Sequence, residues 1–176
     1  MAVPTRPVQD AIIDPAWGQW VHDNLLRRIN PPGADVHHPA AISIPPTAWT
    51  AITWVDTDEL RDVGGWRSGS SSRLTVPATQ PAATFYEVHA AGWYVPIINE
   101  GSMAQYGVAV DGASPPAGSI GVYTSSKANN NTLWAFSGKL RLNPGQYVEL
   151  KLWQNFGGPT NVMDARLSIA EASITP

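Results

Sequence analysis

The sequence predicts a mainly β fold, an antiparallel jelly-roll β-sandwich of about ten strands that follows an N-terminal arm and one short α-helix. From residue 40 onward, strand-like segments follow one another with turn signals at regular intervals and no helical segment between them. Before them, one stretch carries apolar residues three and four positions apart, which is typical of an amphipathic helix. We therefore expect an attachment segment over residues 1–39 and a head domain over residues 40–176.

The clearest strand pair lies in residues 140–156, where two strands fold about a turn. In the turn Asn143-Pro144-Gly145, the proline fixes φ at the first central position and the glycine accepts a positive φ at the second. After the turn, apolar residues alternate with polar ones, so that they share one face of a strand. These apolar residues are Val148, Leu150 and Leu152.

The opposite face of the same strand carries charges and aromatic rings together. Glu149 and Lys151 point to this face, and Tyr147 and Trp153 share its parity. Two large rings on one outward face indicate that part of it meets another surface. The strand therefore suits a two-sheet sandwich that packs against copies of itself.

The helix is predicted to run from Pro15 to about Ile29. Asp14 is a favourable N-cap, proline fits the first helical position, and Pro31-Pro32-Gly33 stops the helix. A lone helix of this length is marginal in water, so its apolar stripe needs a partner: its own β-domain, the same helix of sister subunits, or a larger particle. A Pro-rich linker over residues 30–39 separates the helix from the head and favours the last two. The stripe consists of Trp17, Trp20, Val21, Leu25 and Ile29.

The remaining strands follow from short β-rich runs between turn residues. Gly92, inside the long run 84–95, predicts a bulge. Residues 56–72 are polar and are expected to form a long loop with one short edge strand near Trp66. The other predicted strands are 40–44, 48–55, 73–76, 106–110, 119–125, 131–142, 146–155 and 165–174.

The composition excludes several classes of protein. Charged residues make up 14% of the 176 residues, the net charge is −3 and no Lys/Arg cluster occurs, which argues against nucleic-acid binding. The chain has no cysteine, so neither a disulfide framework nor a thiolate metal site is available. No apolar run approaches ~18 residues, so we expect no membrane insertion.

A search for chemistry gives little. The carboxylates Asp56, Asp58, Glu59 and Asp62 share one loop; a solvated loop is the favoured interpretation, with a calcium site or a glycosidase-type acid pair as alternatives. The histidines His22 and His89 are expected to be solvated or packed. Neither a nucleophile elbow nor a phosphate-binding loop occurs. We therefore predict no catalytic residue, no metal ligand and no cofactor.

The order of signals from Ile42 onward resembles the complement-globular-head/tumour-necrosis-factor-like jelly roll, in the version found on bacteriophage structural proteins. The first forty residues are similar to the N-terminal segment of phage minor tail proteins, in which a short helix reading like WGQWVHDNLLRRI (17–29) precedes Pro-Pro-Gly and a variable domain. The head-domain pieces that carry the resemblance are IPPTAWTAITW (44–54), GGWRSGSSSRLTVP (64–77), FYEVHAAGWYV (85–95) and LNPGQYVELKLWQNFGG (142–158).

This resemblance implies a homotrimer of ten-stranded jelly rolls on an N-terminal attachment segment. Tyr147, Glu149 and Trp153 would then lie on the strand nearest the threefold axis. An ion held on that axis by His37 and His38 is a disfavoured alternative, because adjacent side chains in an extended segment point opposite ways. Loops at the end away from the tether would form the binding surface. The candidate residues on these loops are Asp56, Asp58, Trp66, Asn129, Asn130 and Asn155.

We expect a non-enzymatic phage virion structural protein. Its N-terminal segment would bind other virion proteins, and its head would project to bind a host cell-surface glycan or protein, as in a minor tail or receptor-binding protein. A capsid decoration protein or head fibre is the nearest alternative; a wall-polysaccharide depolymerase using the acidic loop and a bacterial adhesin are more distant ones. The N-terminus lacks the apolar run of a Sec signal, so assembly into the virion is expected in the host cytoplasm.

Overall fold

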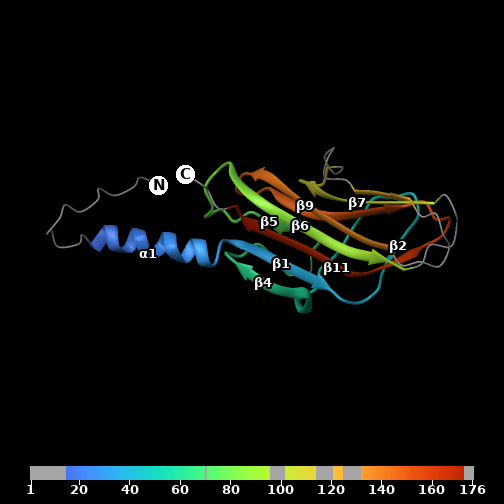
Figure 1. Ribbon diagram of the computed structural model, residues 1–176, viewed down its shortest axis with the longest axis horizontal. Helices are drawn as coiled ribbons and strands as arrows, with labels where there is room; N and C mark the ends of the chain where they lie inside the picture. Colours follow the sequence, from blue (N-terminus) through green and yellow to red (C-terminus); the bar gives the residue numbers. More distant parts are fainter. Residues whose placement is uncertain (1–14, 70, 96–101, 114–120, 125–131, 173–176) are drawn as a thin grey trace.

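The computed structural model describes residues 15–69, 71–95, 102–113, 121–124 and 132–172. One helix precedes a head made of two antiparallel β-sheets (Figure 1). The elements in chain order are α1 (Pro15–Ile29), β1 (Gly33–His38), β2 (Ile42–Ile44), β3 (Thr50–Ala51), a 3-10 helix (Asp56–Asp58), β4 (Glu59–Val63), β5 (Leu74–Thr75), β6 (Thr84–Tyr94), β7 (Met103–Val110), β8 (Gly121–Thr124), β9 (Thr132–Leu142), β10 (Tyr147–Gln154) and β11 (Thr160–Glu171).

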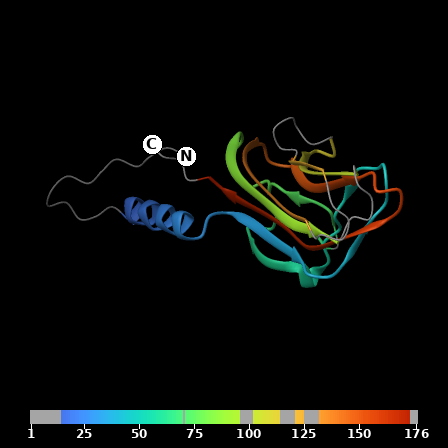
Figure 2. The same cartoon turned by 45° about the vertical axis from the view of Figure 1, so that its right-hand side comes forward.

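Helix α1 leaves the sandwich at one end and extends away from it in both views (Figure 1, Figure 2). Its bounds, Pro15 to Ile29, match the prediction. Its last turn is tied to the head by a side chain: Arg27 donates to Glu171 at 2.6 Å and to Gln80 at 3.2 Å. The alternative that the helix docks along its own β-domain is wrong, since Ile29 remains 79% exposed. Within the described residues, no helix is long and apolar enough to cross a membrane.

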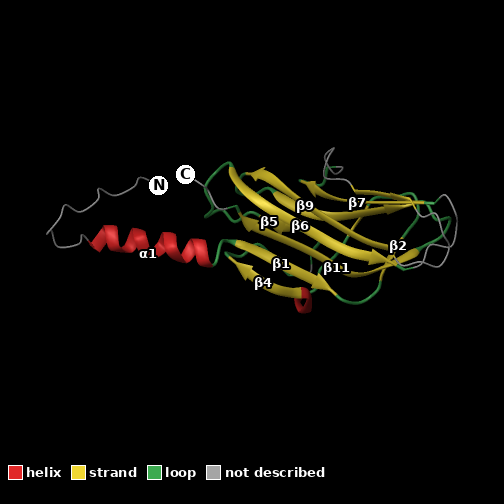
Figure 3. Ribbon diagram, in the orientation of Figure 1, coloured by secondary structure: helices red, strands yellow, loops and turns green. Residues whose placement is uncertain are grey.

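The two sheets form the predicted antiparallel jelly-roll sandwich, with strands along the whole head (Figure 3). The six-stranded sheet has the order β4-β1-β11-β6-β9, and β2 also pairs with β11. The five-stranded sheet has the order β3-β10-β7-β8, and β5 also pairs with β10. Strands β1 and β11 are far apart in sequence but adjacent in the sheet, so the chain enters and leaves the sandwich at the same end (Figure 1).

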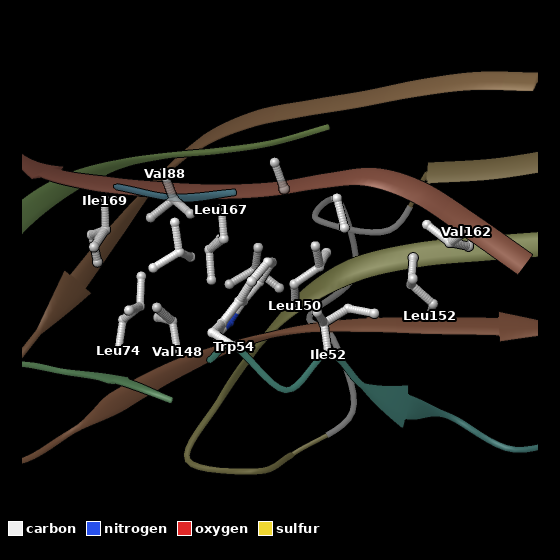
Figure 4. Close-up of a cluster of buried hydrophobic side chains, with 14 of the residues drawn as sticks. Ile52, Trp54, Leu74, Val88, Val148, Leu150, Leu152, Val162, Leu167 and Ile169 are labelled. Carbon is white, nitrogen blue, oxygen red and sulfur yellow. The ribbon is translucent and has the colours of Figure 1, made fainter. Parts of the chain in front are cut away.

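The core lies between the sheets, where side chains from both layers point toward one another (Figure 4). Strand β6 shows the expected period of two, with alternate residues buried along its length. Burying each large aliphatic side chain contributes about 1.5–3 kcal/mol, so this cluster carries most of the driving force for folding. The facing residues include Val88, Leu167 and Ile169 from one sheet, Val148, Leu150 and Leu152 from the other, and Trp54 from the segment after β3.

The segment expected to be a linker is in part a strand of the head, which corrects the predicted boundary at residue 40. Strand β1 lies between β4 and β11 and pairs with β11 over its full length, from Gly33 to His38. Its alternate residues Ala34 and Val36 are fully buried. The head therefore begins at Gly33, and the connection to α1 is only a few residues long.

The loop predicted over residues 56–72 contains more regular structure than expected. It begins with the 3-10 helix and continues into the edge strand β4. The short strand expected near Trp66 lies instead at Glu59–Val63. Trp66 is buried and packs edge-on against Tyr86, with ring centroids 5.1 Å apart. The Trp66 indole therefore packs the segment after β4 against the core.

The bulge predicted at Gly92 is on the neighbouring strand. Asp164 and Ala165 of β11 together lie opposite Gly92, and Asp164 has a φ of 50°. Pairing of β6 with β9 runs through Gly92 without a register shift. The glycine serves a different purpose: a Cβ at this position would lie 2.5 Å from Cζ2 of Trp134.

Candidate binding surfaces

The outer face of the six-stranded sheet, called here the outer sheet face, carries mostly small side chains in its middle and larger side chains, apolar and charged, toward its ends. The antiparallel registers bring outward side chains of β1, β11, β6 and β9 side by side. Phe85 and Leu133 are 54% and 82% exposed near its two ends. A shallow hollow in its middle is lined by His89, Ala91, Ala135, Ser137, Arg166 and Ser168, with parts of Ala90 and Phe136.

Charges on the outer sheet face are largely paired within the chain. Arg166 binds Asp35 through two hydrogen bonds of 3.0 and 2.5 Å, which raises the pKa of the guanidinium. Trp93 Nε1–H donates to Asp164 at 2.7 Å, and His37 Nε2 lies 3.4 Å from the same carboxylate. The Trp93 hydrogen bond is the main reason that the pKa of Asp164 lies below its ordinary value. Such pairing lets another surface cover this face without leaving an isolated charge.

Sequence reasoning did not identify the outer sheet face. In a strand over residues 84–95, the period of two puts Phe85, His89 and Trp93 on one side. The neighbouring residues on β9 and β11 come from segments about 50 and 80 positions away, at registers that one sequence does not reveal. The surface is therefore a product of tertiary pairing.

Glu149, predicted at a trimer interface, lies inside a network of its own chain. It is only 6% exposed, because the segment before β5 covers the outer side of β10. Its carboxylate accepts a 2.6 Å hydrogen bond from Ser72 Oγ and lies 3.7 Å from Arg73 and 3.6 Å from Lys151. The two cations and the hydroxyl replace the water that an exposed carboxylate would bind.

Tyr147 and Trp153, the other predicted interface residues, flank that network on β10. The guanidinium of Arg73 lies 4.2 Å from the centre of the Tyr147 ring, a cation–π contact within the chain. Both side chains are partly buried. Their placement at a subunit interface stays a prediction.

Two of the predicted surface-binding residues are buried, which corrects that part of the prediction. Trp66 is 1% exposed because it packs on Tyr86. Asp58 is 3% exposed because it accepts hydrogen bonds from the Val55 backbone and from His38, both at 2.8 Å. Neither side chain can contact a ligand at the surface.

The remaining loop candidates are at different places. Asp56 is exposed, while Asn155 is exposed at the end of the head opposite α1 and accepts the Met103 N–H through its side-chain oxygen. Asn129 and Asn130 lie outside the described residues. The structure therefore does not bring the predicted loop residues into one described site.

Each of the four carboxylates of the acidic loop has a partner within the chain. Asp56 and Glu59 lie 3.7 and 3.4 Å from the guanidinium of Arg67. Asp62 accepts three backbone N–H groups from the turn that follows it, and Asp58 is held by His38. These contacts give each carboxylate a structural role and leave no facing pair arranged for acid–base chemistry.

The described histidines are dispersed. His37 points toward Asp164 and His38 toward Asp58, so the two adjacent rings go to different partners. His22 is on the exposed helix, and His89 lines the hollow. In the described part of the chain, no three His, Asp or Glu residues are grouped to hold a metal ion.

Comparisons with known proteins give the fold. No protein-family model matches the sequence, and no curated protein matches it. The globular domain of zebrafish complement 1qA protein is similar in structure, with a TM-score of 0.52 and 15% identity over 81% of this chain and 98% of that chain. Murine APRIL at pH 8.0 gives a TM-score of 0.51 and 13% identity over 80% and 99% of the two chains. The head therefore has a complement-globular-head/tumour-necrosis-factor-like jelly-roll fold.

Proposed function

We propose that this protein is a non-enzymatic structural protein of a phage virion. It acts as a homotrimer whose N-terminal segment attaches to the particle while the jelly-roll head projects and binds the host surface. The observation that carries the proposal is the position of α1, which leaves the head at one end with exposed apolar side chains (Figure 1). The similarity of the first forty residues to phage minor tail proteins supports the same role.

The outer sheet face supports assembly of the heads. A cyclic trimer uses two different complementary patches on each subunit, and each patch of a stable interface buries about 800 Å². This face offers a hollow with small side chains between exposed apolar residues, and its main charges are already paired. A neighbouring subunit can therefore approach closely at low cost in desolvation.

The contacts of the acidic loop support a role without catalysis. Its carboxylates bind Arg67, His38 and backbone N–H groups, which stabilise the loop. We assign the loop to the support of the head rather than to cleavage of a polysaccharide.

The oligomeric state provides the first test. Sedimentation analysis of the purified chain is expected to give three times the 18.9 kDa mass of one subunit. The variant Ala91→Arg places a long cation in the hollow and should yield folded monomers, whereas Ala78→Arg, on an exposed turn, should remain trimeric. If Trp153→Ala breaks the trimer and Ala91→Arg does not, the interface lies on β10, as the sequence predicted.

Particle attachment is tested separately. Deleting residues 1–30 removes α1 and keeps β1, so the head should fold but fail to join particles. Incorporation of the truncated protein would contradict the attachment role. An electron-microscopy map of the virion would then assign the projecting density to the tail or to the capsid.

A further inference from the structure

One side of α1 carries a row of apolar residues at four-residue spacing: Trp17, Val21, Leu25 and Ile29. With 3.6 residues per turn, this row spans about 120° of the helix circumference. Leu25 and Ile29 are 53% and 79% exposed, although each is large enough to contribute strongly when buried.

The row faces away from the head of its own chain. Arg27, which binds Glu171 and Gln80 of the head, lies about 140° around the helix from the middle of the row. Asn30 accepts hydrogen bonds from Arg61 and is also on the side turned from the row. The chain's own head therefore does not bury the row, and a 15-residue helix is marginal without tertiary contacts.

The distribution of charge permits identical helices to meet along the first three turns of this row. Asp23 is the only charged residue of α1 before Arg27, and it lies opposite the row, where it accepts a 2.7 Å hydrogen bond from Gln19. Arg27 and Arg28 follow in the last turn, near the head, where Arg27 is paired with Glu171 and Arg28 lies about 40° from the middle of the row. Copies that meet over the first three turns would therefore bring no like charges together.

The path of the chain brings the helices of a trimer to one place. Helix α1 ends at Ile29 and β1 begins at Gly33, so the helix is joined closely to the six-stranded sheet. The salt bridge from Arg27 to Glu171 further ties the last turn to β11 of that sheet. Heads assembled through the outer sheet face would thus hold three helices at one end at high effective concentration.

We propose that the apolar row of α1 binds the same row on the two sister subunits and forms a three-helix base beneath the heads. This inference rests on the homotrimer of the proposed function. Because the row follows four-residue spacing, its ridges favour helices that cross at about −50° rather than a parallel coiled coil. The closest approach is then near Val21 and Leu25.

Cysteine cross-linking of the full chain tests this arrangement. The chain has no cysteine, so a single introduced thiol reports one position. Leu25→Cys and Leu26→Cys form a matched pair, since these leucines are 53% and 51% exposed and point about 100° apart. A bismaleimide with a reach of about 8 Å matches the separation of packed helices. Because such a reagent joins two thiols and a trimer holds three, Leu25→Cys should saturate with about two thirds of chains in covalent dimers.

The outcomes separate this inference from the proposed function. Cross-linking of Leu25→Cys and Val21→Cys to about two thirds, with little for Leu26→Cys, supports the three-helix base. A trimeric mass without cross-linking at either row position, or equal cross-linking of Leu26→Cys, overturns the base but leaves the homotrimer intact. Complete conversion of Leu25→Cys chains into covalent dimers would indicate that the helices meet in pairs, and this result also overturns the three-helix base. A monomeric mass for the unmodified chain overturns the homotrimer and the base together.

Discussion

Replacement of Gly92 by alanine should destabilise the head through one identifiable clash. The added Cβ would lie 2.5 Å from Cζ2 and 3.0 Å from Cε2 of Trp134. The indole cannot move aside freely, because it is 5% exposed and stacks on Tyr106 with ring centroids 4.8 Å apart. Carbon atoms in a packed core prefer separations of about 3.5–4.0 Å, so the ring or the strand must shift by about 1 Å.

The magnitude follows from two opposing effects. Overpacking of a core costs about 1–3 kcal/mol. Replacing a glycine also lowers the conformational entropy of the unfolded chain, which raises the free energy of unfolding by about 0.4–1 kcal/mol. We expect Gly92→Ala to lower the free energy of unfolding by about 1–2 kcal/mol, which for a chain of this size lowers Tm by roughly 2–8 °C.

Urea and thermal unfolding at equal protein concentration measure this change, since association also contributes to apparent stability. Gly158→Ala is the matched control, because a Cβ there meets no atom within 4 Å, and its stability should match or slightly exceed that of the original chain. Trp134→Phe removes the clashing ring atoms and loses no hydrogen bond in the described structure, so Gly92→Ala should cost little in that background. Equal stability of Gly92→Ala and the original chain would refute this account of Trp134.

Two further predictions concern polar groups on the sheets. Trp93→Phe removes the main hydrogen bond to Asp164, so the pKa of this carboxyl should rise toward its ordinary value in an NMR titration, and an unchanged titration would contradict the assignment. Because the pKa of Asp164 is lowered in the folded protein, the stabilisation from this carboxylate is present at neutral pH and is lost as the pH falls through the lowered pKa. Glu149→Gln should lower the free energy of unfolding, measured in urea, by about 1–2 kcal/mol, because a neutral amide binds Ser72 and Lys151 less strongly than a carboxylate does. An unchanged free energy of unfolding would show that the network around Glu149 does not stabilise the head.

The long strands could be predicted because their inward residues alternate locally. In β10, Val148, Leu150 and Leu152 are fully buried, as the period of two indicated. The same reasoning did not show that Glu149 would be covered, since the covering residue Ser72 lies 77 positions away. Local pattern thus identified the face of each strand, and tertiary contacts decided what lies over it.

Strand β1 shows where composition misled the prediction. Its neighbouring prolines and two histidines indicated a linker, yet Ala34 and Val36 alternate with Asp35 in a short strand. Strand β4 had no such pattern, because as an edge strand it has no fully buried residue. The pairing of His38 with Asp58 depends on both of these strands and therefore could not be foreseen.

The position of β1 has a mechanical consequence for a head held by its N-terminal segment. A pull transmitted through α1 enters β1 at Gly33 and runs along the strand (Figure 1). Because β1 is paired on both sides, with β4 and β11, its backbone hydrogen bonds lie across the pulling direction and share the load. Such shear loading requires many bonds to break at once, so the same pairing that brings the start of β1 beside the end of β11 also resists separation of the head from its anchor.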